Sequence, residues 1–278
     1  MASEPRRRWI TSSYLTWAIA SLSTGVLFFF GTGLEPKWFI TWLASLPVLV
    51  LAPRISGKAT AAVAFTGYLL GTLNVAGYYL DTLELPIPLV AGIFTVTSAI
   101  FCGAAILFRT LLLQDRLLLA VVTFGSLFAG AEYVLGNAVH CGANWSLAPT
   151  QAEFLPMVQL ASVTGIWGVS FLVAVTPAAV AVILTRRAPT TGRLRVGIAA
   201  AAVLAASLSY GFVQLDKDHR APSVHVALLA ARLPAPEPIL DVSTSEGLRL
   251  LEADLAALAN VPPRTYMEIG RASCRERV

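Results

Sequence analysis

The most informative stretch of this sequence is FLPMVQLASVTGIWGVSFLVAVT, which runs from Phe154 to Thr176. The chain stays apolar from there to Leu184, and the run contains no charged residue after Glu153. An ionised side chain in the middle of a bilayer costs several kcal/mol, so a segment this long without one is typical of a membrane span. We therefore predict that the chain is built around membrane-spanning helices.

The composition of the whole chain supports this interpretation. Hydrophobic residues make up 56% of it and charged residues 13%, and the mean hydropathy is +0.70. Soluble domains are about half apolar and about a quarter charged, so these values indicate a polytopic membrane protein. The net charge of +4 does not indicate a nucleic-acid partner, because the arginines occur in short clusters between apolar runs. The three cysteines are too few and too scattered for a disulfide framework.

Seven apolar runs can be recognised along the chain. Most are long enough to cross a hydrocarbon core of about 30 Å as a helix, although the second is short. Within the third run, Gly67 and Gly71 are four residues apart and predict a close approach by a neighbouring helix. The runs are Tyr14–Phe30, Trp38–Ala52, Thr60–Leu80, Leu85–Phe108, Leu117–Leu135, Leu155–Leu184 and Val196–Leu215.

The basic residues predict how these spans are oriented. If the N-terminus is cytoplasmic, the outer segments between spans contain one basic residue, Lys37, and the inner segments contain eleven. This bias follows the positive-inside rule, and it places the chain after the seventh run outside the cytoplasm. The eleven inner residues are Arg6, Arg7, Arg8, Arg54, Lys58, Arg109, Arg116, Arg186, Arg187, Arg193 and Arg195.

A different pattern begins after the last run. Val224–Ala230 begins with β-branched residues and lies between Pro222 and Pro234, which predicts a strand. Ser243 and Glu246 form a capping-box pattern at the start of an amphipathic helix. The apolar face of that helix consists of Leu248, Leu251, Leu255 and Leu258. A strand followed by such a helix is the beginning of an α/β domain, and the residues left are too few to bury a core alone.

Residues 268–278, EIGRASCRERV, continue neither pattern. They look like the in-frame translation of a sequencing adapter, so we expect genuine sequence to end near Met267. The predicted fold is an all-α polytopic membrane bundle of about seven helices, followed by the start of an α/β domain. The predicted divisions are a cytoplasmic N-terminus at 1–13, a transmembrane domain at 14–215, an incomplete outer domain at 222–267 and an artefactual tail at 268–278.

The order of several residues around the sixth run is a family signature, and it resembles the membrane domain of apolipoprotein N-acyltransferases. Trp38–Pro53 looks like the second span of that family. Val224–Ala230 looks like the first strand of its nitrilase-like domain, a member of the carbon–nitrogen hydrolases. The residues that carry the resemblance are Glu132-Tyr133, Trp145, Gln151, Leu155-Pro156 and the stretch from Gln159 to Val173.

The resemblance implies an enzyme of a bacterial inner membrane with its catalytic domain on the outer face, and a eukaryotic membrane is left open. Such enzymes move an acyl chain from a phospholipid to the N-terminal cysteine amine of a lipoprotein. A thiolate attacks the ester, a Glu acts as acid and base, and a Lys helps to stabilise the oxyanion. No cofactor or metal is implied, and the oligomeric state is left open.

The catalytic residues of that family are largely missing from this chain. The Lys and the Cys have no counterpart, and only Glu268 falls near the expected position of the catalytic Glu. That Glu normally ends an apolar strand, whereas Glu268 follows a polar stretch and begins the adapter-like tail. We therefore assign no catalytic residue and expect the chain as written to be inactive.

Three residues of the membrane domain are candidates for contact with substrate or lipid. Trp145 lies in an outer loop, where it would either hold acyl chains at the mouth of a cleft or anchor the loop at the membrane interface. Glu132 lies inside an apolar run, which favours a structural hydrogen bond between the fifth span and its outer loop. Gln151 would bond either loop backbone or a lipid head group.

Two other functions remain open at this point. A membrane-anchored carbon–nitrogen hydrolase would share the catalytic residues, but its cleft would open to water and take a soluble amide or nitrile. A transporter or scaffold would need the seven spans alone. The spans lack the buried charged pairs and matching broken helices that would indicate a substrate path through them.

Overall fold

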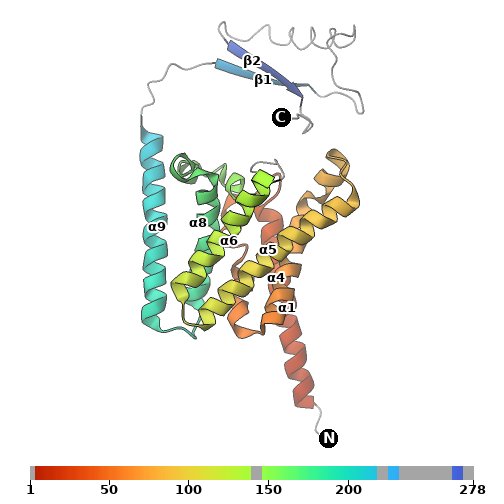
Figure 1. Cartoon of the computed structure of the whole chain (residues 1–278), viewed down its shortest axis with the longest axis vertical. Coiled ribbons are helices and arrows are strands. Elements are labelled where there is room, and N and C mark those ends of the chain that lie inside the picture. Colours follow the sequence, from red (N-terminus) through yellow and green to blue (C-terminus); the bar gives the residue numbers. More distant parts are fainter. Residues whose placement is uncertain (1–3, 139–145, 218–224, 232–264, 272–278) are drawn as a thin grey trace. The chain divides into compact units, whose positions relative to one another are not determined.

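The computed structural model of the chain describes residues 4–138, 146–217, 225–231 and 265–271 (Figure 1). It divides into two compact units, Met1–Lys217 and Asp218–Val278, and each is described by itself. The first unit is a bundle of helices, and the described part of the second is a pair of strands.

Five helices among the described residues are long and apolar enough to cross a membrane. They coincide with the first run and with the fourth to the seventh, so the prediction of a helical membrane bundle is confirmed for these five. They are α1 (Glu4–Gly31, apolar from Tyr14), α5 (Ile87–Leu113), α6 (Leu117–Ala138), α8 (Ala161–Leu184) and α9 (Thr190–Asp216).

The second and third runs are helical but irregular, and the prediction of seven spans is not confirmed for them. Pro47 and Pro53 each begin a new segment in the second run, because proline fits only the first turn of a helix. That run forms α2 (Trp38–Thr41), α3 (Leu46–Leu51) and η1 (Ala52–Arg54). The third forms α4 (Gly57–Thr72), η2 (Leu73–Val75) and η3 (Tyr78–Thr82).

Glycines allow α1 and α4 to pack closely, as predicted from the spacing of Gly67 and Gly71. A Cβ atom on Gly71 would overlap the Cβ of Phe28, and one on Gly25 would lie 2.7 Å from the Cβ of Leu70. No side chain fits into either gap, so the two backbones meet directly. Aromatic rings fill the core beside this contact, with Phe101 wholly buried and in edge-on contact with Phe28.

The sixth run begins with a broken helix. Its first turn is the short helix α7 (Leu155–Val158), which has Pro156 in its opening turn. Gly165 then has a φ of +67°, although it lies within the bounds of α8. A residue with a side chain rarely adopts this conformation, so the start of this run is irregular where a continuous helix was expected.

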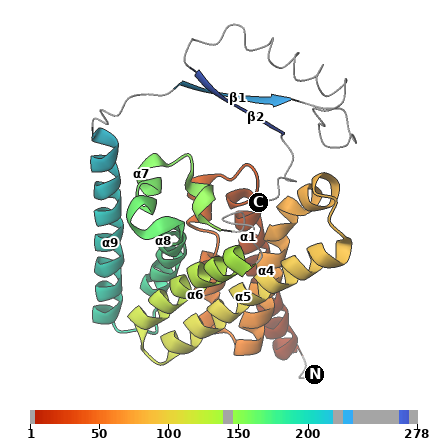
Figure 2. The same cartoon turned by 45° about the horizontal axis from the view of Figure 1, so that its top comes forward.

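Helix α9 lies beside α7 and α8 at one side of the bundle (Figure 2). The approach is very close at Gly211, where an added Cβ would overlap the carbonyl oxygen of Pro156. This contact therefore fixes the position of α9 against α7.

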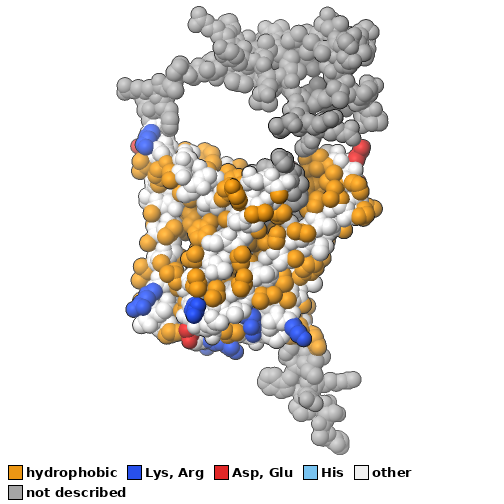
Figure 3. Space-filling model, viewed as in Figure 1, with side chains coloured by type: hydrophobic (Ala, Val, Ile, Leu, Met, Phe, Trp, Pro, Cys, Tyr) orange, Lys and Arg blue, Asp and Glu red, His pale blue; other side chains and the backbone are white. Residues whose placement is uncertain are grey.

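Lys and Arg side chains gather at the end of the helical unit where α1 begins (Figure 3). Arg109 also has a structural role there, because Nε donates to the carbonyls of Ala52 and Ile55, both at 3.0 Å, and Nη2 donates to Ile55 at 2.8 Å. These bonds satisfy carbonyl groups at the end of the second run. The gathering of charge at one end agrees with the bias on which the predicted orientation rests.

In the second unit, β1 (His225–Ala231) pairs in parallel with β2 (Thr265–Arg271). A strand therefore lies where Val224–Ala230 was predicted to form one. The predicted amphipathic helix around residues 243–258 lies outside the described residues, and the α/β domain stays a prediction. Glu268 lies in β2, opposite Leu228.

Candidate functional site

The candidate site is the segment between α6 and α7, from Ser146 to Phe154, together with the part of the bundle that holds it. Its centre is the 3-10 turn η4 (Ala148–Gln151), which has Pro149 in its first turn. Most of this segment is buried although it carries several polar side chains. Buried polar groups need partners, so the hydrogen bonds of the segment determine how it is held.

Glu132 joins α6 to this segment. Its side chain is 6% exposed, and Oε1 accepts a hydrogen bond of 2.9 Å from the amide of Leu147. The sequence favoured a hydrogen bond of this kind, between Glu132 and the loop that follows its helix. The other carboxyl oxygen, Oε2, is buried and has no hydrogen-bond partner among the described residues.

Two serines continue this buried polar cluster from α6 to α8. The hydroxyls of Ser146 and Ser170 are 2.7 Å apart, and the amide of Ala148 donates to both at 3.1 Å. Ser170 is wholly buried in α8. Hydrogen bonds therefore connect the start of this segment to two helices, to α6 through Glu132 and to α8 through Ser170.

The side chain of Gln151 connects the last residue of η4 to the second run by hydrogen bonds. Its side chain is 0% exposed, and its Oε1 accepts a hydrogen bond of 2.8 Å from Nε1 of Trp42. Its Nε2 donates to the carbonyl of Trp38 at 3.2 Å and to the hydroxyl of Thr150 at 3.0 Å. Gln151 thus bonds to a backbone carbonyl, and a contact with a lipid head group stays a prediction.

The structure brings Glu132 and Gln151 to the two ends of the same segment. Trp145 lies outside the described residues, and so its role stays a prediction. Glu268 belongs to the other unit, and nothing is assigned to it here. Among the residues that the structure describes, no group of three or more His, Cys, Asp or Glu side chains could hold a metal ion.

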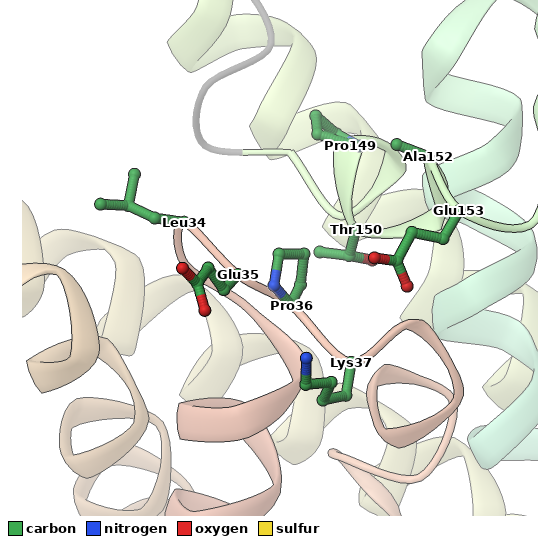
Figure 4. Close-up of a pocket in the computed structure, with 8 residues that line it drawn as sticks. All are labelled: Leu34, Glu35, Pro36, Lys37, Pro149, Thr150, Ala152 and Glu153. Atoms are coloured by element: carbon green, nitrogen blue, oxygen red, sulfur yellow. The ribbon is translucent and has the colours of Figure 1, made fainter.

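Two cavities flank this segment, and neither was predicted from the sequence. The first has a volume of about 360 Å³ and is lined by both charged and apolar residues. Lys37 and Glu153 extend into the space between the two loops, with Glu35 at its side (Figure 4). All three charged side chains are exposed. The lining residues are Leu34, Glu35, Pro36, Lys37, Pro149, Thr150, Ala152 and Glu153.

The second cavity is an open apolar groove of about 190 Å³. One wall is aromatic, and in it the ring of Trp38 stacks on Phe154 with centroids 4.5 Å apart and planes at 14°. Another side belongs to α9, with Leu204 and Leu208. Phe39 and Trp42 complete the lining.

One signal in the sequence could have indicated both cavities. Lys37-Trp38 and Glu153-Phe154 are each a charged residue followed by an aromatic one, and each pair stands at the start of an apolar run. The pairs are more than a hundred residues apart in the chain, so nothing in the sequence shows that they meet.

Comparisons with known proteins agree with the family signature. Residues 24–179 match the family model described as apolipoprotein N-acyltransferase N-terminal domain. A curated apolipoprotein N-acyltransferase of Geobacter metallireducens is 25% identical over 242 residues, which cover 82% of this chain and 44% of that relative. The chain therefore spans less than half the length of the curated relative that it matches.

Proposed function

This chain belongs to the apolipoprotein N-acyltransferase N-terminal domain family, and on that premise we propose that it supplies the membrane half of an N-acyltransferase. The proposed reaction transfers an acyl chain from a membrane phospholipid to the N-terminal cysteine amine of a lipoprotein. The observation that carries this proposal is the match over residues 24–179, which includes α4 to α6, the fastened outer segment and most of α8.

The proposed role of the membrane unit is to hold the lipid substrate and the outer loops in the positions that acyl transfer requires. Glu132, Ser170 and Trp42 fix the outer segment against three different parts of the bundle. A segment held in this way is preorganised, so it can position a substrate without a further loss of conformational freedom. In this proposal, the chemistry is supplied by a nitrilase-like domain that carries the thiolate and the Lys of the family.

The proposed location is the bacterial inner membrane, with a cytoplasmic N-terminus and with residues after 215 outside the cytoplasm. Five apolar helices and the family match support an integral membrane protein. The gathering of Lys and Arg side chains at the end where α1 begins supports the orientation (Figure 3).

A chimera tests the proposed function. Residues 1–217 of this chain would replace the corresponding membrane part of the Geobacter relative, which keeps its own outer domain. The purified chimera would be given a phospholipid and a diacylglyceryl-modified lipopeptide, and N-acylated product would be measured by mass spectrometry. We expect product from the chimera and from the parent, and none from a chimera whose catalytic Cys is replaced by Ala.

The same assay separates the alternatives. A chimera that is folded and inserted but makes no N-acylated product, beside an active parent, would overturn the proposal. Release of ammonia from soluble amides without any acyl transfer would favour a hydrolase instead.

A further inference from the structure

Two turns lie at the end of the bundle that is remote from the candidate site, one between α5 and α6 and the other between α8 and α9. They lie side by side, because a Cβ atom on Gly192, near the start of α9, would lie 2.8 Å from Cδ1 of Leu117, the first residue of α6. The candidate site is connected to other parts of the same helices, through Glu132 near the end of α6 and Ser170 in the first half of α8. The two turns therefore form a separate surface.

This surface carries a surplus of positive charge, and Lys and Arg side chains gather at this end of the helical unit (Figure 3). Asp115 is the only acidic residue in the described stretches 114–118 and 184–198. The same stretches contain five arginines, so the surface attracts anions and repels cations. The five are Arg116, Arg186, Arg187, Arg193 and Arg195.

One of these arginines holds the turn itself. Nη1 of Arg193 donates to the carbonyl of Ile183 at 3.3 Å, and Nη2 donates to the hydroxyl of Thr190 at 3.2 Å. Ile183 lies in the last turn of α8, where carbonyl groups lack partners within the helix. The other four arginine side chains are exposed. We call them the arginine cluster, which consists of Arg116, Arg186, Arg187 and Arg195.

Exposed apolar side chains border the arginine cluster. They are Leu118 on α6, Leu184 at the end of α8, and Leu194 and Ile198 on α9, and at least half of each is exposed. All three helices are candidate membrane spans, so in a membrane these side chains contact hydrocarbon and the arginines lie at the level of the head groups. A nucleic acid or an acidic protein would contact only the arginines, whereas an anionic phospholipid contacts both kinds of side chain.

We propose that the arginine cluster binds the head group of an anionic phospholipid, in the leaflet at this end of the bundle. Guanidinium groups of the cluster donate hydrogen bonds to the phosphate oxygens, for which their planar fork is well suited. The acyl chains lie along the exposed apolar side chains of α6 and α9. A zwitterionic lipid binds less tightly, because its head group also carries a cation that the arginines repel.

A lipid bound in this place connects α9 to α6. Among the described helices, α9 is the least buried of the five candidate spans, so an additional connection at this end helps to hold it. Binding therefore stabilises the folded bundle by mass action. The lipid lies at the far end of α6 and α8 from the candidate site, so it is not the acyl donor of the proposed reaction, and the inference does not rest on that reaction.

Native mass spectrometry of the whole chain in an uncharged detergent tests this proposal. Phosphatidylglycerol or phosphatidylcholine with the same acyl chains would be titrated in, and the bound fraction at each concentration gives an apparent Kd. We expect phosphatidylglycerol to bind about twentyfold to thirtyfold more tightly, because each of two arginines beside the head group contributes about fivefold. Equal affinities for the two lipids would overturn the proposal.

Two double variants with the same loss of charge test where the lipid binds. Arg187→Gln with Arg195→Gln should remove most of the preference for phosphatidylglycerol. Arg54→Gln with Lys58→Gln should retain it, because these exposed residues lie at the start of α4, which packs against α1 and α5. Equal losses in the two double variants would show attraction to overall charge and would overturn the assignment to the arginine cluster.

Two further arms protect the test against misfolding and against a soluble ligand. If the double variant at the cluster does not insert, Arg187→Gln and Arg195→Gln would be measured singly, each with an expected loss of about fivefold. Singly inserted variants with unchanged preference would also overturn the assignment. Soluble glycerol phosphate at the concentration of the lipid should not displace phosphatidylglycerol, and equal displacement would show that the ligand is a free phosphate and not a lipid.

Discussion

The contact between α9 and α7 predicts a large effect of one added methyl group. A Cβ at Gly211 would overlap the carbonyl oxygen of Pro156 and lie 2.6 Å from its carbonyl carbon and 2.9 Å from its Cα, whereas ordinary contact begins at 3.4 Å. In Gly211→Ala, the two backbones must therefore separate, since none of these atoms belongs to a side chain that can rotate away. Overpacking of this kind costs about 1–3 kcal/mol, and a rigid backbone partner favours the upper half of that range.

The free energy of unfolding in mixed micelles, followed by circular dichroism, measures this cost. The matched control is Gly130→Ala in α6, where an added Cβ meets nothing within 4 Å. That change should be neutral or stabilising by up to about 1 kcal/mol, because alanine is the better helix former. If Gly211→Ala and Gly130→Ala had the same free energy of unfolding, the proposed positioning of α9 by this contact would be refuted.

Changes at three further residues test the hydrogen bonds that hold the bundle, by the same unfolding measurement. Glu132→Ala leaves the buried amide of Leu147 without its acceptor and should destabilise by about 1–3 kcal/mol, whereas Glu132→Gln keeps an acceptor and should lose less. Trp42→Phe leaves Oε1 of Gln151 without its indole donor, with an expected loss in the same range of about 1–3 kcal/mol. Arg109→Lys keeps the positive charge but loses the planar guanidinium that donates to the carbonyls of Ala52 and Ile55, so this variant should be less stable than the parent. Equal stability would argue against the role of Arg109 in satisfying these carbonyls.

The helical bundle was predictable from the sequence because membrane spans are recognisable by their length and lack of charge. The composition of the second run remains apolar throughout, but Pro47 indicates from the sequence that a helix is kinked or ends there. Pro47 and Pro53 break the helix locally. The distortion at Gly165 was not predicted either, because a glycine in an apolar run is equally compatible with a regular helix.

The candidate site was predictable only in part. A carboxylate inside an apolar run requires a nearby partner, and this is why Glu132 could be connected with its own outer loop. The partner of Gln151 is Trp42, 109 residues away in the chain, and no local pattern indicates such a contact. Each of the two cavities is lined by residues from distant parts of the chain, so no local sequence pattern predicts them.

The proposed role as the membrane half of an N-acyltransferase is tested most directly by the mass of a lipoprotein's N-terminal peptide. The cells would have, as their sole N-acyltransferase, the chimera that carries residues 1–217. We expect a peptide heavier by one acyl chain than the peptide from cells with the Cys→Ala chimera. A peptide that stays diacylated, while the chimera accumulates in the membrane at the level of the active parent, would contradict the proposed role.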